Sequence, residues 1–284
     1  MEIPSGVVPM GSKLAILSDI HMRDGDVDDV HDALAGAKAQ IQEFEPDRTI
    51  VLGDLIQDAD PEGDRRHIEL VTDQLAALEP RYLAGNHDTE HLSPDELEDL
   101  FGNELWGHET LDSVDLVYLD SSAAHLPKAR SEISKIQLRL LKSVLQETRE
   151  TLVFVHHPIH YRDIRSNPWF GERPELAFCA SKAWVQQLFD QYGGVCATFN
   201  GHVHENNHTQ YRGIDHFTIN AVNKERPDSD TVTGTYALVS LADRLSVEVY
   251  DRSGFIREWS VPRGPKPQIE HDSEGATSSG TSES

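Results

Sequence analysis

Residues 14–21 read LAILSDIH, a short apolar run that ends in a carboxylate and an imidazole. The same design recurs in TIVLGD at residues 49–54 and in RYLAGNHD at residues 81–88. Helical patterns fill the two intervals, at about residues 27–44 and 65–78. Strands that alternate with helices predict a parallel sheet, with polar groups gathered where the strands end at their carboxyl side.

The later part of the chain first continues this alternation and then loses it. Ser93 with Glu96 has the spacing of a capping box and predicts a helix start. Ser134 with Gln137 repeats that spacing, and a further helix is predicted over residues 181–192. Short strands are predicted at residues 116–119, 151–155, 195–199, 209–211, 217–219, 235–241 and 245–250. The last four lack helices between them, which favours hairpins in a second sheet packed on the first.

The chain is strongly acidic, since 49 Asp and Glu against 25 Lys and Arg give a formal net charge of −24 over 284 residues. One interpretation is adaptation to molar salt, where the screening length shrinks to about 3 Å and like charges repel less. The alternative is an acidic enzyme of ordinary salinity. Under either interpretation a broad basic track for duplex nucleic acid is missing, so extended nucleic acid is not expected as a partner.

Composition also bears on compartment and domain organisation. Cys179 and Cys196 are too few for a disulfide framework or a thiolate metal site, and we expect both to be buried in a reducing cytosol. No leader and no apolar run of ~20 residues is found, so a soluble, cytoplasmic protein without a membrane partner is expected. We expect an N-terminal extension at 1–12, one catalytic domain at 13–264 and a disordered acidic Ser/Gly-rich tail at 265–284. A homo-oligomer is left open.

Two more apolar runs lead into residues that can ligate metals, one at His156-His157-Pro158 and one at Gly201-His202-Val203-His204. Each of the five motifs alone is typical of an ordinary turn or capped loop. Their common position after predicted strands favours a metal site, because independent turns would seldom share it. The sequence therefore predicts two metal ions, held by oxygen and nitrogen at one cleft, an arrangement that cleaves phosphate esters.

The spacing within the motifs supports this interpretation. Asp19 and His21, two residues apart at a strand end, point in the same direction and can share one cation. Asp54 follows a glycine and has two oxygens, which suits a carboxylate that bridges two ions. His202 and His204 repeat the two-residue spacing, but the flexible glycine before them allows them to face different ions.

The five motifs, over residues 14 to about 205, resemble the calcineurin-like metallophosphoesterase superfamily, and most closely its class III cyclic-nucleotide phosphodiesterases and glycerophosphodiesterases. The resemblance implies an α/β fold, a four-layer α/β/β/α sandwich of two mixed β-sheets flanked by helices. It implies these metal ligands: Asp19, His21 and His204 on the first ion, Asn86, His156 and His202 on the second, and Asp54 between them. The choice of His156 over His157 rests on the family pattern.

The resemblance also implies the chemistry. His87 would lie beside the ions, where it contacts the phosphoryl group or protonates the leaving group. Asp88 either orients that imidazole or is an exposed loop carboxylate. Asn86 offers a neutral carbonyl oxygen, and the mixed oxygen and nitrogen set suits Mn²⁺, Fe and Zn²⁺ alike. Two such ions lower the pKa of a shared water towards ~7, which predicts in-line attack of hydroxide on phosphorus.

The segment after the fourth motif is the candidate substrate rim, because arginine can fork onto phosphate and an aromatic ring can stack on a base. The alternative is a segment that only packs over the sheet or contacts another subunit. The candidate substrate-binding residues are Arg23, Tyr161, Arg162, Arg165 and Trp169. Further histidines that could line the cleft are His91, His125, His160 and His208.

Together these features predict a metal-dependent phosphoric ester hydrolase for a small soluble phosphate ester. A phosphodiester of the cyclic-nucleotide or glycerophosphodiester type is the first expectation. A phosphomonoesterase and a nuclease of the same fold are alternatives, and the acidic composition disfavours the nuclease. A non-catalytic scaffold is a further alternative, but such proteins usually lose ligands, whereas every ligand position is filled here.

Overall fold

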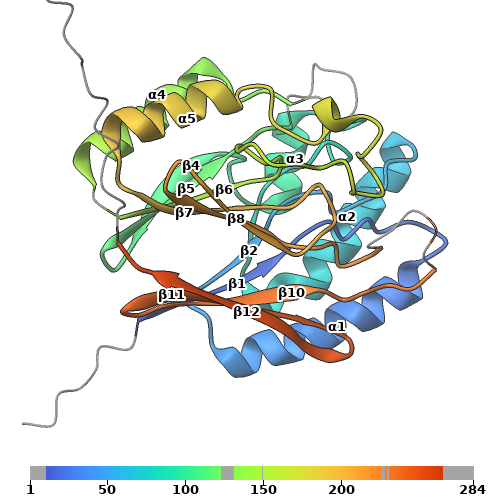
Figure 1. Cartoon of the computed structure of the whole chain (residues 1–284). Coiled ribbons are helices and arrows are strands. Elements are labelled where there is room, and N and C mark those ends of the chain that lie inside the picture. Colours follow the sequence, from blue (N-terminus) through green and yellow to red (C-terminus); the bar gives the residue numbers. More distant parts are fainter. Residues whose placement is uncertain (1–10, 123–130, 149, 225–227, 229, 265–284) are drawn as a thin grey trace, which may run out of the picture.

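The computed structural model describes residues 11–122, 131–148, 150–224, 228 and 230–264. Two six-stranded β-sheets lie face to face, and helices cover the outer face of each sheet (Figure 1). This is the four-layer α/β/β/α sandwich that the family resemblance implied. The predicted tail at 265–284 lies outside the described residues, as do His125 and all but the last two residues of the predicted extension.

The first sheet has the strand order β12-β11-β10-β1-β2-β3. Its strands are β1 (Ser12–Leu17), β2 (Arg48–Val51), β3 (Arg81–Tyr82), β10 (Tyr236–Leu241), β11 (Arg244–Asp251) and β12 (Gly254–Pro262). β1, β2 and β3 run parallel, with Ile16 beside Ile50, whereas β10 pairs antiparallel with β1. The parallel strands carry almost continuous apolar runs because both of their faces are buried.

The second sheet has the strand order β4-β5-β6-β7-β9-β8. Its strands are β4 (Gly107–Leu111), β5 (Val114–Leu119), β6 (Thr151–Val155), β7 (Val195–Asn200), β8 (Asn207–Tyr211) and β9 (Ile214–Thr218). β5, β6, β7 and β9 run parallel, while β4 and β8 are antiparallel edge strands. All five residues of β6 are buried, which matches its continuous run of apolar and β-branched residues.

Three apolar cores hold the four layers together. The helices are α1 (Val27–Phe44), α2 (Pro61–Leu75), η1 (Ala76–Leu78), α3 (Pro94–Phe101), α4 (Lys135–Glu147), η2 (Pro174–Leu176) and α5 (Lys182–Tyr192). Leu34 of α1 belongs to the core beneath the first sheet, and Phe154 and Phe199 belong to the core between the sheets. Leu141 of α4 and Phe189 of α5 belong to the core above the second sheet. Each fully buried side chain of this kind contributes about 1.5–3 kcal/mol.

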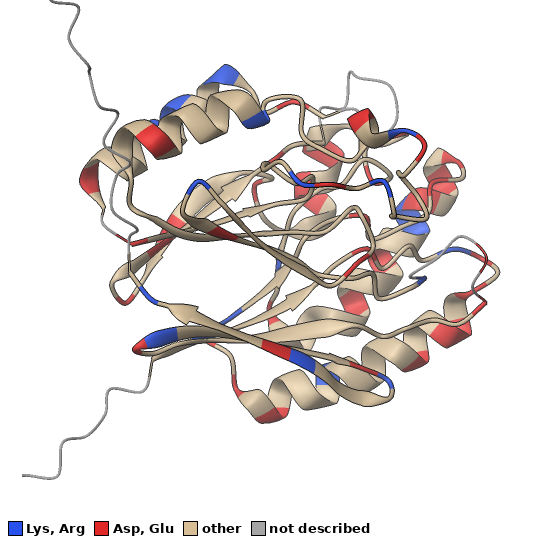
Figure 2. Ribbon diagram, viewed as in Figure 1, with Lys and Arg blue, Asp and Glu red and all other residues tan. Residues whose placement is uncertain are grey.

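The outer surface carries the excess of acidic residues. Acidic side chains occur on the helices of both outer layers and on the connecting loops, and basic ones are fewer (Figure 2). No helix in the described part of the chain is long and apolar enough to cross a membrane. Both cysteines are buried and unpaired, as expected from the sequence.

The C-terminal hairpins differ from the prediction, because they do not form a second sheet of their own. β8 and β9 extend the second sheet beside β7, and β10, β11 and β12 extend the first sheet beyond β1. β4 and β12 were not predicted. Both are edge strands with mostly exposed or half-buried residues, so neither carries the apolar signal on which strand prediction depends.

The capping box predicted at α3 is complete, whereas the one predicted at α4 is half formed. Ser93 and Glu96 satisfy each other's backbone N–H groups. At α4 the Ser134 hydroxyl accepts from the Gln137 N–H at 3.4 Å. The side chain of Gln137 instead bonds both backbone groups of Asp120, at 2.8 and 3.0 Å. A long-range contact in the folded protein therefore replaces the local one.

The carboxyl ends of the parallel strands of both sheets meet at one edge of the sandwich. The backbone N–H of Asp19, after β1, donates to the carbonyl of Gly53, after β2, at 3.0 Å. The N–H of His202, after β7, donates to the Asp19 carboxylate at 3.0 Å and so links the two sheets. The N–H of Gly201 donates to the carbonyl of His156 at 3.1 Å. The motifs, scattered along the chain, are thereby brought to one place.

Candidate metal centre

Five of the seven expected ligands have the left-handed backbone conformation, which non-glycine residues rarely adopt. They are Asp19 (φ 52°), His21 (φ 46°), Asp54 (φ 51°), His202 (φ 69°) and His204 (φ 49°). Such residues cost about 1–3 kcal/mol each and persist where surrounding structure holds them. Here backbone hydrogen bonds between neighbouring loops hold them, including His21 N–H to the Asp54 carbonyl at 3.0 Å. Strain concentrated on ligand-type residues marks a functional site.

Glycines allow the ligand loops to approach one another. A Cβ at Gly201 would overlap the Ser18 hydroxyl and the Asp19 carboxylate, and a Cβ at Gly85 would overlap Asp54. Any side chain at either position would displace a carboxylate of the site. The glycines of these motifs are therefore required by space rather than only by a turn.

The first group of expected ligands consists of Asp19, His21 and His204, all buried. The Nδ1 of His204 lies 2.7 Å from the Lys224 carbonyl, which can only accept, so this nitrogen carries the proton and Nε2 keeps a free lone pair. That Nε2 lies 3.4 Å from Asp19 Oδ1 and 3.1 Å from the Nε2 of His21. One carboxylate and two imidazole nitrogens thus converge on a point suited to one cation.

The second group consists of Asn86, His156 and His202. His156 donates from Nδ1 to the Leu52 carbonyl at 2.9 Å, which directs its buried Nε2 towards Asp54 Oδ2 at 3.2 Å. His202 donates from Nε2 to the Leu176 carbonyl at 3.1 Å, which leaves Nδ1 as its expected ligand atom. The buried carbonyl oxygen of Asn86 lacks a hydrogen-bond partner. A buried acceptor left unsatisfied beside these imidazole nitrogens fits a second cation.

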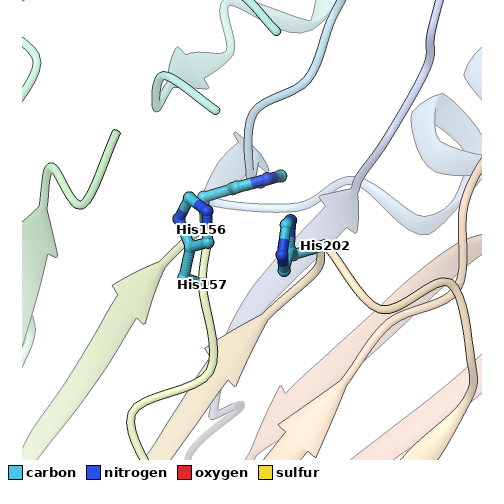
Figure 3. A group of neighbouring side chains, drawn as sticks. All are labelled: His156, His157 and His202. Atoms are coloured by element: carbon cyan, nitrogen blue, oxygen red, sulfur yellow. The ribbon is translucent and has the colours of Figure 1, made fainter. Parts of the chain in front are cut away.

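His157 also lies near the second group. Figure 3 shows His156 and His157 extending from the end of β6 towards His202, which follows β7. The three histidines can offer ligand atoms within 4.8 Å of one another, and the ring centres of His157 and His202 are 4.1 Å apart. However, Nδ1 of His157 pairs with the Ser121 hydroxyl at 2.9 Å, and only His156 is placed against Asp54. The position of Asp54 thus supports the choice of His156, which stays a prediction.

Asp54 lies between the two groups. Its Oδ2 is 3.2 Å from the Nε2 of His156 and 3.8 Å from the Nε2 of His21, and its Oδ1 accepts from the His87 N–H at 2.8 Å. Burial raises the pKa of Asp54, but the positive charge of the neighbouring histidines outweighs it and lowers the pKa overall. Burial lowers the pKa of His156, and the Asp54 carboxylate more than offsets this, raising it to about 9. The carboxylate therefore attracts positive charge, as a bridging ligand would.

His87 borders the site, and its Nδ1 pairs with residues outside both ligand groups. That nitrogen contacts the Asp58 carboxylate and lies 3.1 Å from the Gln57 amide nitrogen. Burial lowers the pKa of His87, but the carboxylates of Asp54 and Asp58 outweigh burial and raise it. Asp58 follows Asp54 by four residues in a polar loop, and nothing in its spacing distinguished it from a turn residue.

Asp88 differs from one of the two expectations for it. It is buried, so the exposed-carboxylate alternative is wrong, while an orienting effect on the His87 imidazole stays a prediction. Its oxygens accept from the backbone N–H groups of Leu55 and Gly85, both at 2.8 Å. Burial and the nearby Asp54 charge raise its pKa to about 7. Asp88 thus ties the loops after β2 and β3 together, and Asp58 contacts Nδ1 of His87.

A cavity of about 300 Å³ opens onto both ligand groups. Of the five candidate substrate residues, Arg23 and Trp169 line it, and Arg23 also pairs with Asp26 at 2.7 Å. The other three lie outside the lining: Tyr161 packs against Tyr211, Arg162 pairs with Glu205, and Arg165 pairs with Asp163. Residues that line the cavity but were not singled out as site residues are Gln57, Phe170, Asn223 and Lys224.

This architecture and these ligands define a class of protein. The model of the calcineurin-like phosphoesterase family matches residues 12–206, and the chain belongs to this family. It is a metal-dependent phosphoester hydrolase, and several groups of its His and Asp side chains could hold a metal ion. Curated proteins give no match to the chain.

Solved structures show the same fold at low sequence identity. A dimetal phosphatase from Danio rerio is 15% identical, with a TM-score of 0.69 over 89% of this chain and 99% of that one. A purple acid phosphatase from yellow lupin seeds is 13% identical, with a TM-score of 0.63 over 89% of this chain and 54% of that one. GAP50, an anchor in the inner membrane complex of Plasmodium, is 12% identical, with a TM-score of 0.57 over 91% and 90%.

Proposed function

We propose that this protein hydrolyses small phosphodiesters of the cyclic-nucleotide or glycerophosphodiester type. The observation that carries the proposal is the cavity, whose lining includes expected ligands of both groups and the aromatic rings of Trp169 and Phe170. At about 300 Å³ it lies at the small end of the range for ligand sites, which suits a small ester. A diester bears a second organic group where a monoester has a charged oxygen, and the aromatic wall offers that group an apolar surface.

Different residues of the site would hold the cations, donate a proton and attract the substrate. The residues that would hold two cations are Asp19, His21, Asp54, Asn86, His156, His202 and His204. When bound, Mn²⁺, Fe or Zn²⁺ ions would neutralise phosphate oxygens and lower the pKa of water. Contact with Asp58 fixes the ring of His87 through Nδ1, which leaves Nε2 to donate a proton to the leaving oxygen. Arg23 and Lys224, at the cavity wall, would attract the anionic substrate.

The test compares bis-p-nitrophenyl phosphate with p-nitrophenyl phosphate after the protein is stripped of metal and reloaded with Mn²⁺. We expect kcat/KM for the diester to exceed that for the monoester by about tenfold or more. Asp54→Asn, prepared in parallel, is expected to be inactive towards both and controls for contaminating phosphatases. Preference for the monoester would instead show a phosphomonoesterase.

A second comparison separates the two diester types. Trp169, whose side chain is 39% exposed at the cavity wall, can stack on a base but has no aromatic partner in a glycerophosphodiester. If the substrate is a cyclic nucleotide, Trp169→Ala should raise its KM by about tenfold, since base stacking contributes about 1–3 kcal/mol. An unchanged KM for cyclic nucleotides, with measurable turnover of glycerophosphodiesters, would favour the second type.

A further inference from the structure

The segment between β6 and α5 touches both histidines of the Gly201-His202-Val203-His204 motif. The ring of Trp169 lies 4.9 Å from that of His204, and the ring of Phe170 lies 4.7 Å from that of His202. The carbonyl of Leu176, in the same segment, accepts from the Nε2 of His202 and so determines which nitrogen faces the site. One segment thus contacts a ligand from each group.

Asn167 joins this segment to the ligand loop. The residue is 5% exposed and uses both ends of its side-chain amide. Its Nδ2 donates to the Val203 carbonyl at 2.7 Å and to Glu205 Oε1 at 2.6 Å. Its Oδ1 accepts from the backbone N–H groups of Trp169 and Phe170, both at 2.9 Å. A single buried amide therefore sets the distance between the aromatic pair and the histidines that the pair contacts.

Glu205 strengthens this connection. Its second oxygen, Oε2, pairs with Arg162 at 3.1 Å, and the Arg162 side chain is 9% exposed. The ligand loop is thus bound to the 162–170 segment by an amide and by a largely buried ion pair. Arg162 was also a candidate substrate residue, and in the structure its side chain pairs with Glu205.

We propose that Asn167 is a positioning residue of the metal centre, which acts through the ligand loop and the aromatic pair to orient His202 and His204. The physical basis is that residues behind metal ligands fix ring orientation, and their loss typically weakens metal binding by about 10–100-fold. The inference rests on the metal ligands and is independent of which ester is the substrate.

The experiment titrates metal-free protein with Mn²⁺ while its tryptophan emission is recorded, and isothermal calorimetry measures the affinity. The Trp169 signal is the difference between the parent and Trp169→Phe. Asn167→Ala is expected to weaken Mn²⁺ binding by about tenfold and to reduce the metal-dependent change in Trp169 emission. Asn167→Asp keeps the acceptor for the two loop N–H groups but loses both donors, so its affinity is also expected to fall. Arg173→Ala, in the same segment with its exposed side chain near Glu175, is the matched control and should behave like the parent.

Three results would overturn the proposal. The first is an Asn167→Ala variant with the parent's near-ultraviolet circular dichroism, Mn²⁺ affinity and Trp169 response. The second is Asn167→Asp with the parent's affinity. If Asn167→Ala does not fold, the isosteric Asn167→Asp and Glu205→Ala, whose side chain is 29% exposed, decide. Glu205→Ala with parent affinity is the third contrary result, and we expect it to bind Mn²⁺ more weakly.

Discussion

Asp54→Asn is the substitution that best tests whether Asp54 binds both cations or only one. The amide matches the carboxylate in shape and removes one negative charge. The Nε2 atoms of His156 and His21, one from each ligand group, lie 3.2 and 3.8 Å from Asp54 Oδ2. At such separations the attraction between two opposite unit charges is about 4–5 kcal/mol at an effective dielectric constant of ~20. That energy corresponds to about 10³-fold in affinity, and it applies to each cation.

The assay is calorimetric titration of the metal-free variant with Mn²⁺, followed by elemental analysis of the loaded protein after gel filtration. Asp54→Asn should lose both equivalents together. Asp163→Asn, which removes an exposed carboxylate that pairs only with the neighbouring Arg165 among the contacts described here, is the matched control and should retain both. A folded Asp54→Asn protein that keeps one equivalent at parent affinity would refute the bridging position of this residue.

Three further predictions concern the general acid, protons and salt. His87→Ala should keep both metal equivalents but lower turnover of an ester with a poor leaving group by about 10², and unchanged turnover of that ester would contradict its role as an acid. Because Asp54 raises the pKa of His156 to about 9 in the metal-free protein, this histidine carries a proton at neutral pH. Metal binding should therefore release that proton, and the affinity for metal should increase as the pH rises towards that pKa. Calorimetry in two buffers of different ionisation enthalpy measures the release. If no proton is released, His156 is not the ligand proposed. If the net charge of −24 reflects molar salt, the Tm should rise between low and molar KCl, and a Tm that does not rise favours an acidic enzyme of ordinary salinity.

The buried elements of the fold were predictable from the sequence. β6 was predicted at its observed bounds, because five apolar or β-branched residues stand between polar ones, and α1 was predicted from its apolar period. The edge strands β4 and β12 were not, because a strand with one exposed edge and few buried side chains carries no such signal. The assignment of the last hairpins to two sheets depends on which neighbours they meet, and local sequence does not encode this.

The expected metal ligands could be predicted from the sequence, whereas the residues that hold those ligands in place could not. The ligands could be found because each follows an apolar strand in a short polar motif. Their supports could not, because Leu176 and Lys224 act through backbone carbonyls that any residue possesses. Asn167 lies in a loop rich in turn residues, and only the fold shows that its amide reaches Val203 and Glu205. For the same reason Asp88, though part of a recognised motif, was expected either beside an imidazole or exposed in a loop, and its bonds to backbone N–H groups were not foreseen.

One cleft between Asp19 and His204 is expected to gather two cations. Anomalous X-ray diffraction from crystals of the Mn²⁺-loaded protein tests it most directly. Two anomalous peaks about 3.5–4 Å apart on either side of the Asp54 carboxylate are the predicted result. A single peak, or none at full metal saturation, would contradict it.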